Sequence, residues 1–197
     1  MPDRPFQPFG GYEKLKSYAF AEAIYDATVV FCERFYQKNF RMTDQMVQAA
    51  RSGVRNLSEA SGAAATSKKS EMTLTNVARA SLRDELLPDV RTFMTQRKLA
   101  IWSKDDTRTL EMRKRLYHDR APWVKETEGK IVLTGIKGLA DFAERAEPEL
   151  VGNAMLCALH QASWLILRQL KGQMRQFEQE GGFSENLSRR RRKRWDA

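Results

Sequence analysis

Apolar residues recur every three or four positions along most of the chain, which is the spacing of one face of an α-helix. Between residues 44 and 82 this pattern predicts two helices separated by the small-residue segment 62–66. We expect Thr43 and Asp44 to cap the first of them, over 44–61, and the second to begin at Thr66 or Ser67. Two such helices with a tight connection form an antiparallel pair, the unit of a helical bundle.

Two further long helices are predicted on either side of this pair. Residues 12–39 carry a wide apolar face that includes Phe20, Ile24 and Phe31, and such a width is typical of contact with more than one neighbour. Residues 148–180 begin with a proline between two glutamates, which suits the first turn of a helix, and end at a glycine pair.

The remaining segments give weaker signals. The helix over 67–98 contains Pro88, which predicts either a kink or a restart at that residue. The inserted segment 103–147 begins with a Ser103 cap and a basic helix that ends before Pro122. Residues 130–134 are compatible with a strand, but no partner strand is evident, so we expect a loop or an edge element there. A short helix is expected over 139–145.

These patterns predict an all-α protein: an antiparallel up-down four-helix bundle with an inserted helical extension between the third and fourth core helices. The bundle domain spans 12–180, and its core helices occupy 12–39, 44–61, 67–98 and 148–180. We expect an irregular lead over 1–11 and a basic, disordered tail over 181–197.

The helical pair resembles a known family. The matching residues are Gln45, Ala49, Ala50, Arg51, Ser52, Asn56 and Glu59 before the loop, and Ser67–Glu71, Ala78–Leu82 and Glu85 after it. They resemble the four-helix bundle proteins encoded in intervening sequences of 23S ribosomal RNA genes, and their relatives, the accessory variability determinant proteins of diversity-generating retroelements. The resemblance covers roughly 12–100 and extends more weakly to the last helix. It departs from the family at Ala60, where glycine is usual, and at Pro88.

The resemblance implies a homopentameric barrel that binds nucleic acid and a reverse transcriptase. The charge of the chain agrees with a polyanionic partner, because the net charge is +9 and Arg189–Arg194 supply six of these charges, leaving +3 for all other residues. The cations expected to bind phosphate, preferentially of RNA, lie in the paired helices, in the inserted helix and in the tail. They are Arg51, Arg55, Lys68, Lys69, Arg113, Lys114, Arg115, Arg189, Arg190, Arg191, Arg192, Lys193 and Arg194. The alternative is a solvated helix surface with local ion pairs, and for the tail a solubilising role.

The sequence offers little for catalysis. Neither His118 nor His160 has a glutamate three residues before it, as a di-metal bundle site requires. A partial metal site of Cys32, Cys157 and His160 is possible on spacing alone, but a core thiol and a core histidine explain these residues more simply. We therefore expect no enzyme activity, no cofactor and no metal.

The two isolated cysteines form no disulfide framework, and we find no signal peptide or membrane span, so we expect a cytoplasmic protein. The function predicted is that of a non-enzymatic nucleic-acid-binding accessory protein. A protein-interaction scaffold is the alternative, and a metal-dependent enzyme is a minor third.

Overall fold

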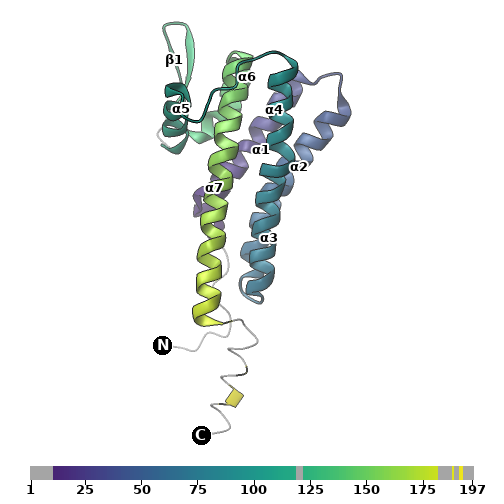
Figure 1. Ribbon diagram of the computed structural model, residues 1–197, viewed down its shortest axis with the longest axis vertical. Helices are drawn as coiled ribbons and strands as arrows, with labels where there is room; N and C mark the ends of the chain where they lie inside the picture. Colours follow the sequence, from purple (N-terminus) through teal and green to yellow (C-terminus); the bar gives the residue numbers. More distant parts are fainter. Residues whose placement is uncertain (1–10, 119–121, 182–187, 189–190, 193–197) are drawn as a thin grey trace.

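The computed structural model describes residues 11–118, 122–181, 188 and 191–192, and within these ranges the protein is mostly helical with one small β-hairpin (Figure 1). The predictions of an irregular lead and a disordered tail fall almost entirely outside these residues. The elements are η1 (Tyr12–Lys14), α1 (Lys16–Phe35), α2 (Phe40–Ala63), α3 (Lys68–Ala80), the π-helical turn η2 (Ser81–Leu86), α4 (Leu87–Gln96), α5 (Thr107–Tyr117), β1 (Val124–Thr127), β2 (Lys130–Leu133), η3 (Ile136–Gly138), α6 (Leu139–Arg145) and α7 (Pro148–Glu180).

The long helices pack side by side around one apolar core. Helix α1 contacts α2 and α7, and α3 contacts the same two helices, so each of these four helices packs on two of the others (Figure 1). Phe20, Phe31 and Phe93 are almost completely buried in this core, and every residue of α7 from 151 to 159 is buried. Removing this much apolar surface from water is the main stabilising contribution to such a fold.

The pair formed by α2 and α3 confirms the predicted hairpin, with a correction at its first cap. The side chain of Asn39, and not Thr43–Asp44, accepts a hydrogen bond from the first turn, at 3.1 Å from the Met42 amide. Asn39 is as good a capping residue as Asp44 and lies one turn earlier, so the helix gains a turn. Helix α3 begins directly after Ser67, one of the two expected starts, and Ser67 caps it, because its Oγ accepts from the Ser70 amide at 3.2 Å.

The first helix is shorter than predicted. It occupies 16–35 and not 12–39, because Leu15 adopts an extended conformation after the η1 turn and Tyr36 leaves the helical region at the other end. The four residues before α2 then connect the two helices.

Pro88 lies in the first turn of α4, as one of the two expected outcomes placed it, but the chain stays helical through the preceding residues and does not restart. The six-residue turn η2 precedes it, and the amide of Leu87 donates to the carbonyl of Leu82, five residues back, which is the π-helical pattern. A proline removes one backbone donor and crowds the carbonyl four residues before it, so a wider turn accommodates the ring without breaking the helix.

Residues 122–134 form a hairpin, which corrects the expectation of a loop or an isolated edge element. Strand β1 pairs antiparallel with β2, with Val124 opposite Leu133 and Thr127 opposite Lys130. The two turn residues, Glu128 and Gly129, both have positive φ angles, as a tight two-residue hairpin turn requires. The partner strand was missed because its sequence, VKET, has only one apolar residue.

The rest of the insertion packs on α1 and α7. Helix α5 is capped by Asp106, which accepts from the Arg108 amide, so the prediction of a Ser103 cap was wrong. Helix α6 has the predicted bounds, and Arg34 of α1 donates to two of its terminal carbonyls, at Ala143 and Ala146. Arg34 thereby satisfies groups that a helix end leaves unpaired.

Helix α7 begins at Pro148 and ends before Gly181, as predicted. Over Pro148–Gln179 it is long and apolar enough to cross a membrane, by length and composition only. However, 67% of its most apolar stretch is buried against the other helices, and the core helix of a folded domain meets the same criteria.

Candidate nucleic-acid interface

The four cations predicted around the α2–α3 connection do not form one surface. Arg51, Arg55 and Lys69 are exposed, but Lys68 is only 9% exposed. The Lys68 ammonium lies 3.0 Å from the Glu71 carboxylate and 3.2 Å from Oε1 of Gln176 on α7. Because its charge is already paired inside a helix contact, Lys68 is not a ligand for an external phosphate.

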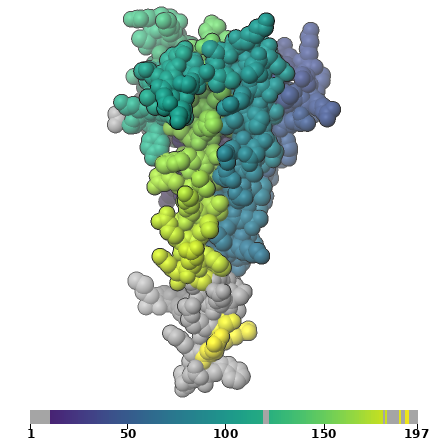
Figure 2. Space-filling view, viewed as in Figure 1, coloured from purple at the N-terminus to yellow at the C-terminus, as the bar shows by residue number. Residues whose placement is uncertain are grey.

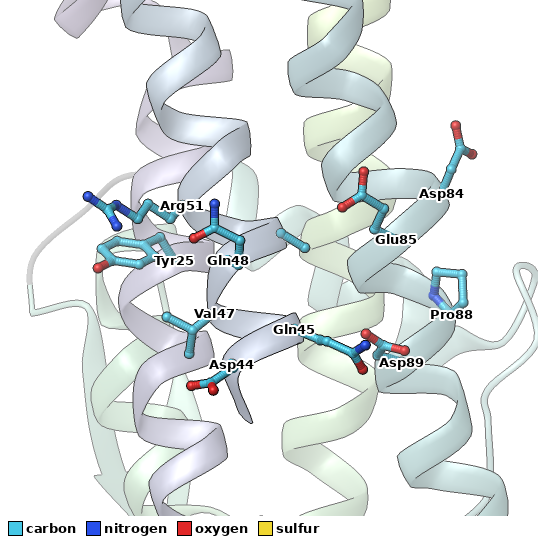
Figure 3. Close-up of a pocket in the computed structure, with 11 residues that line it drawn as sticks. Tyr25, Asp44, Gln45, Val47, Gln48, Arg51, Asp84, Glu85, Pro88 and Asp89 are labelled. Carbon is cyan, nitrogen blue, oxygen red and sulfur yellow. The ribbon is translucent and has the colours of Figure 1, made fainter. Parts of the chain in front are cut away.

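Arg51 lines a groove whose other charges are negative (Figure 3). The groove has a volume of about 850 Å³ and lies between α2 and the η2–α4 segment; the carboxylates of Asp44, Asp84, Glu85 and Asp89 line it. Burial and the nearby charge of Glu85 raise the pKa of Asp89. One guanidinium among four carboxylates makes this groove a poor site for a polyanion.

The three cations of α5 have different surroundings. Arg115 forms an ion pair with Glu111 one turn earlier, and Lys114 is exposed. Arg113 is directed towards α7, where Nε2 of Gln161 donates to its backbone carbonyl at 2.8 Å. Its positive charge lowers the pKa of His160 and partly offsets the effect of burial on the pKa of Cys157.

Two arginines that the sequence did not single out join Arg113. Burial lowers the pKa of His160 first, and the positive charges of Arg113, Arg91 and Arg83 lower it further. Arg91 on α4 and Arg83 on η2 are both exposed, and both elements pack on α7. Three arginines from three elements that pack on α7 therefore lie close enough to His160 for their charges to act on its imidazole.

An exposed aromatic ring follows on the same helix. Trp164 lies one turn after His160 and is 51% exposed. The guanidinium of Arg168, one further turn along, lies over this ring at 4.8 Å from its centroid. We call this surface, made of Arg83, Arg91, Arg113, His160, Trp164 and Arg168, the α7 cationic face. Figure 2 shows α7 (yellow-green) uncovered on this side, between α5 and the α3–α4 segment.

Part of this surface was visible in the sequence. The apolar seam of the last helix passes through Leu159, Ala162 and Ile166, and Trp164 and Arg168 stand outside it. A tryptophan off the seam predicts an exposed aromatic residue. Arg83 and Arg91 gave no such signal, because Pro88 interrupts the pattern between them.

Other predicted residues contribute less to the described surface. In the tail, Arg191 and Arg192 are exposed, while Arg189, Arg190, Lys193 and Arg194 lie outside the described residues. Among the residues the structure describes, no three His, Cys, Asp or Glu side chains are grouped so as to hold a metal. The hypothetical set of Cys32, Cys157 and His160 is not brought together: Sγ of Cys32 contacts Sδ of Met46 at 3.9 Å instead.

Within the described residues, the α7 cationic face contains one cation predicted from the sequence, Arg113, together with Arg83, Arg91 and Arg168, which were not predicted. Comparisons with protein-family models, curated proteins and solved structures find no match to this chain.

Proposed function

We propose that this protein is a non-enzymatic accessory protein that binds nucleic acid, RNA in the first place, through basic surface. The observation that carries the proposal is that Arg83, Arg91 and Arg113 stand on three elements packed on α7, where their charges act on His160, and that Arg168 lies over the exposed ring of Trp164 on the same helix. Charges from three separate elements raise the local positive potential above that of any one helix, and phosphate contacts of this kind supply most of the affinity in sequence-independent binding.

The α7 cationic face differs from the groove at Arg51 in its balance of charge. In the part of the chain that the structure describes, the charged groups that shift the pKa of His160 are all positive, whereas four carboxylates line the groove. A polyanion is attracted to the first surface and repelled from the second. Recognition is then of phosphate and shape, since no base-reading motif is evident.

The proposed architecture is an antiparallel four-helix bundle in which α3, η2 and α4 together form one of the four long helices. By resemblance we extend the proposal to a cytoplasmic homo-oligomer, a pentamer, that assists a reverse transcriptase. The alternative is a scaffold that docks another protein and uses its cations only for solubility; the uncovered apolar side chains Leu167 and Met174 on α7 favour it.

The test compares two double variants with the same loss of charge. Arg83→Gln/Arg91→Gln removes two cations from the α7 cationic face, and Arg51→Gln/Arg55→Gln removes two from α2. Affinity for a fluorescent RNA is measured by anisotropy across a salt titration. We expect the first variant to bind more weakly and its log–log salt slope to fall by about 1.5, with the second close to wild type.

Equal losses in both variants would mean that overall charge, and not this face, determines binding. No binding by the wild-type protein at low salt would reject the nucleic-acid role and leave the scaffold.

A further inference from the structure

The α7 cationic face combines an accessible aromatic ring with cations. Trp164 exposes 51% of its surface, although burial of such a side chain is normally favourable. The guanidinium of Arg168 lies over its ring at 4.8 Å from the centroid, which places a cation beside the exposed indole. His160 lies about 6 Å away along the helix axis, by the rise of one turn.

The position of the ring relative to the charges matters more than its exposure. Trp123 and Trp102 also lie near cations, Lys137 and Arg108 respectively, but on the hairpin and on the linker before α5. Of the three tryptophans that the structure describes, Trp164 is the one on α7, one turn from His160, on which the charges of three arginines act.

The bases of a duplex are stacked on one another, and their flat faces do not reach a helix surface. The bases of a single strand are free to turn outward and stack on an aromatic ring while the phosphates meet cations. Such stacking tolerates any base, because every base has a π-face. Ring and cations on one helix surface therefore match a single strand better than a duplex.

We propose that the α7 cationic face binds single-stranded nucleic acid with one base stacked on the ring of Trp164. This inference rests on the proposed function, since it assigns the kind of strand and the stacking residue to the same surface. The cations supply the salt-dependent part of the affinity, and the tryptophan supplies a part that requires a base.

The experiment uses the full-length protein and three probes of equal length: a single-stranded oligouridylate, an RNA duplex, and an abasic single strand that keeps the phosphates. Wild type is compared with Trp164→Leu and with Trp164→Phe, which retains an aromatic ring. Circular dichroism and light scattering check that each variant keeps its helicity and its mass.

Wild type should bind the oligouridylate more tightly than the abasic strand. Trp164→Leu should lower the affinity for the oligouridylate about tenfold, within the range measured for aromatic stacking. It should leave the salt slope, the affinity for the abasic strand and the affinity for the duplex unchanged. Trp164→Phe should restore most of the loss.

The inference is wrong if Trp164→Leu leaves binding of the oligouridylate intact, or weakens all three probes alike. A smaller assembly mass for Trp164→Leu, with all probes weakened, would show instead that the ring packs against a second copy of the chain. These results leave nucleic-acid binding in place. Failure of the wild-type protein to bind any probe at low salt would reject the proposed function itself.

Discussion

The ammonium of Lys68 lies 3.0 Å from Oε2 of Glu71, and both side chains are enclosed where α3 meets α7. Gln173 of α7 donates to the other carboxylate oxygen of Glu71 at 3.0 Å and to Thr75 at 3.1 Å. A lysine that the sequence suggested as a phosphate ligand thus joins two helices inside the protein.

Replacing Lys68 with methionine should destabilise the protein by about 3 kcal/mol, because Glu71 would keep a buried charge without its partner. Urea unfolding followed by circular dichroism measures this. Lys69→Met is the matched control: the neighbouring side chain is exposed, so the change should stay within about 0.5 kcal/mol. Adding Glu71→Gln to Lys68→Met should recover part of the loss. A fully stable Lys68→Met protein would contradict the buried pair.

Gly53 allows α2 to approach the π-helical turn closely. A Cβ atom at this position would lie 2.7 Å from Cδ2 and Cγ of Leu82, a side chain with no exposed surface. Gly53→Ala should therefore destabilise the protein by about 1–3 kcal/mol, the usual range for overpacking.

Gly62 on the same helix is the control, since a Cβ there would meet nothing within 4 Å. Gly62→Ala should stabilise the protein by about 0.5–1 kcal/mol through helix propensity. Thermal unfolding of both variants against wild type measures the difference. The close approach would be refuted if the two variants had the same stability.

The two thiols should be unreactive in the native protein. Burial raises the pKa of Cys32 to about 12 and that of Cys157 to about 11, and the thiolate is the reactive form. At pH 8, an aromatic disulfide reagent should label neither thiol within minutes in buffer and both at once in guanidinium chloride. Rapid labelling of the native protein would contradict their burial.

The same shifts predict how stability changes at alkaline pH. Because the native state holds these protons above the ordinary thiol pKa of 9.0, the unfolded chain binds fewer protons there. The free energy of unfolding should therefore fall as the pH rises through 9 towards 11. Substituting each cysteine with alanine should reduce this decline, as measured by urea unfolding at several pH values.

Nucleic-acid binding should tighten as the pH falls. Burial and the charges of Arg83, Arg91 and Arg113 lower the pKa of His160, and bound phosphates would offset these charges and raise it. Binding would then take up a proton, and the affinity should increase by up to about tenfold for each pKa unit by which the complex raises His160. Anisotropy titrations between pH 5 and pH 8 at fixed salt measure this dependence.

His160→Gln should flatten this pH profile, whereas His118→Gln, which changes the chain's other histidine, should preserve it. An unchanged profile in His160→Gln would remove the imidazole from the interface.

The basic tail is expected to add affinity without sequence preference. Changing Arg189–Arg194 to alanine removes six charges and should weaken binding to every RNA by a similar factor, with a lower salt slope. The variant should still distinguish the oligouridylate from the abasic strand, because Trp164 is intact. Equal retention of RNA at low salt by wild type and variant would show that the tail takes no part.

Most helices could be predicted because their signals are local. The apolar spacing, the start of α3 beside Ser67, the proline at the start of α7 and the bounds of α6 each depend on residues within a turn or two. The same reasoning placed the first cap of α2 one turn too late, since Asn39 and Asp44 are both good capping residues and nothing local ranks them.

The parts that could not be predicted depend on residues far apart in the chain. The burial of Lys68 follows from Gln176, 108 positions later. The hairpin needed a partner strand with one apolar residue in four. The convergence of Arg83 and Arg113 on His160 depends on how three elements pack, which a pattern along one helix does not show.

The π-helical turn Ser81–Leu86 determines the direction in which the side chains of α4 point around the helix axis, relative to those of α3. Arg91 follows Arg83 by eight residues, over which a regular α-helix would turn the second side chain about 80° from the first around the helix axis. The wide turn absorbs one extra residue, which changes this offset to about 20° in the opposite direction. Closing this turn into a regular α-helix at constant length would swing Arg91 by about 100°, whereas deleting one residue from it would restore regular coiling and keep the offset near 20°. A change that regularises the turn without shortening it would therefore direct the two guanidinium groups to different neighbours, whereas loss of one residue here would preserve their alignment.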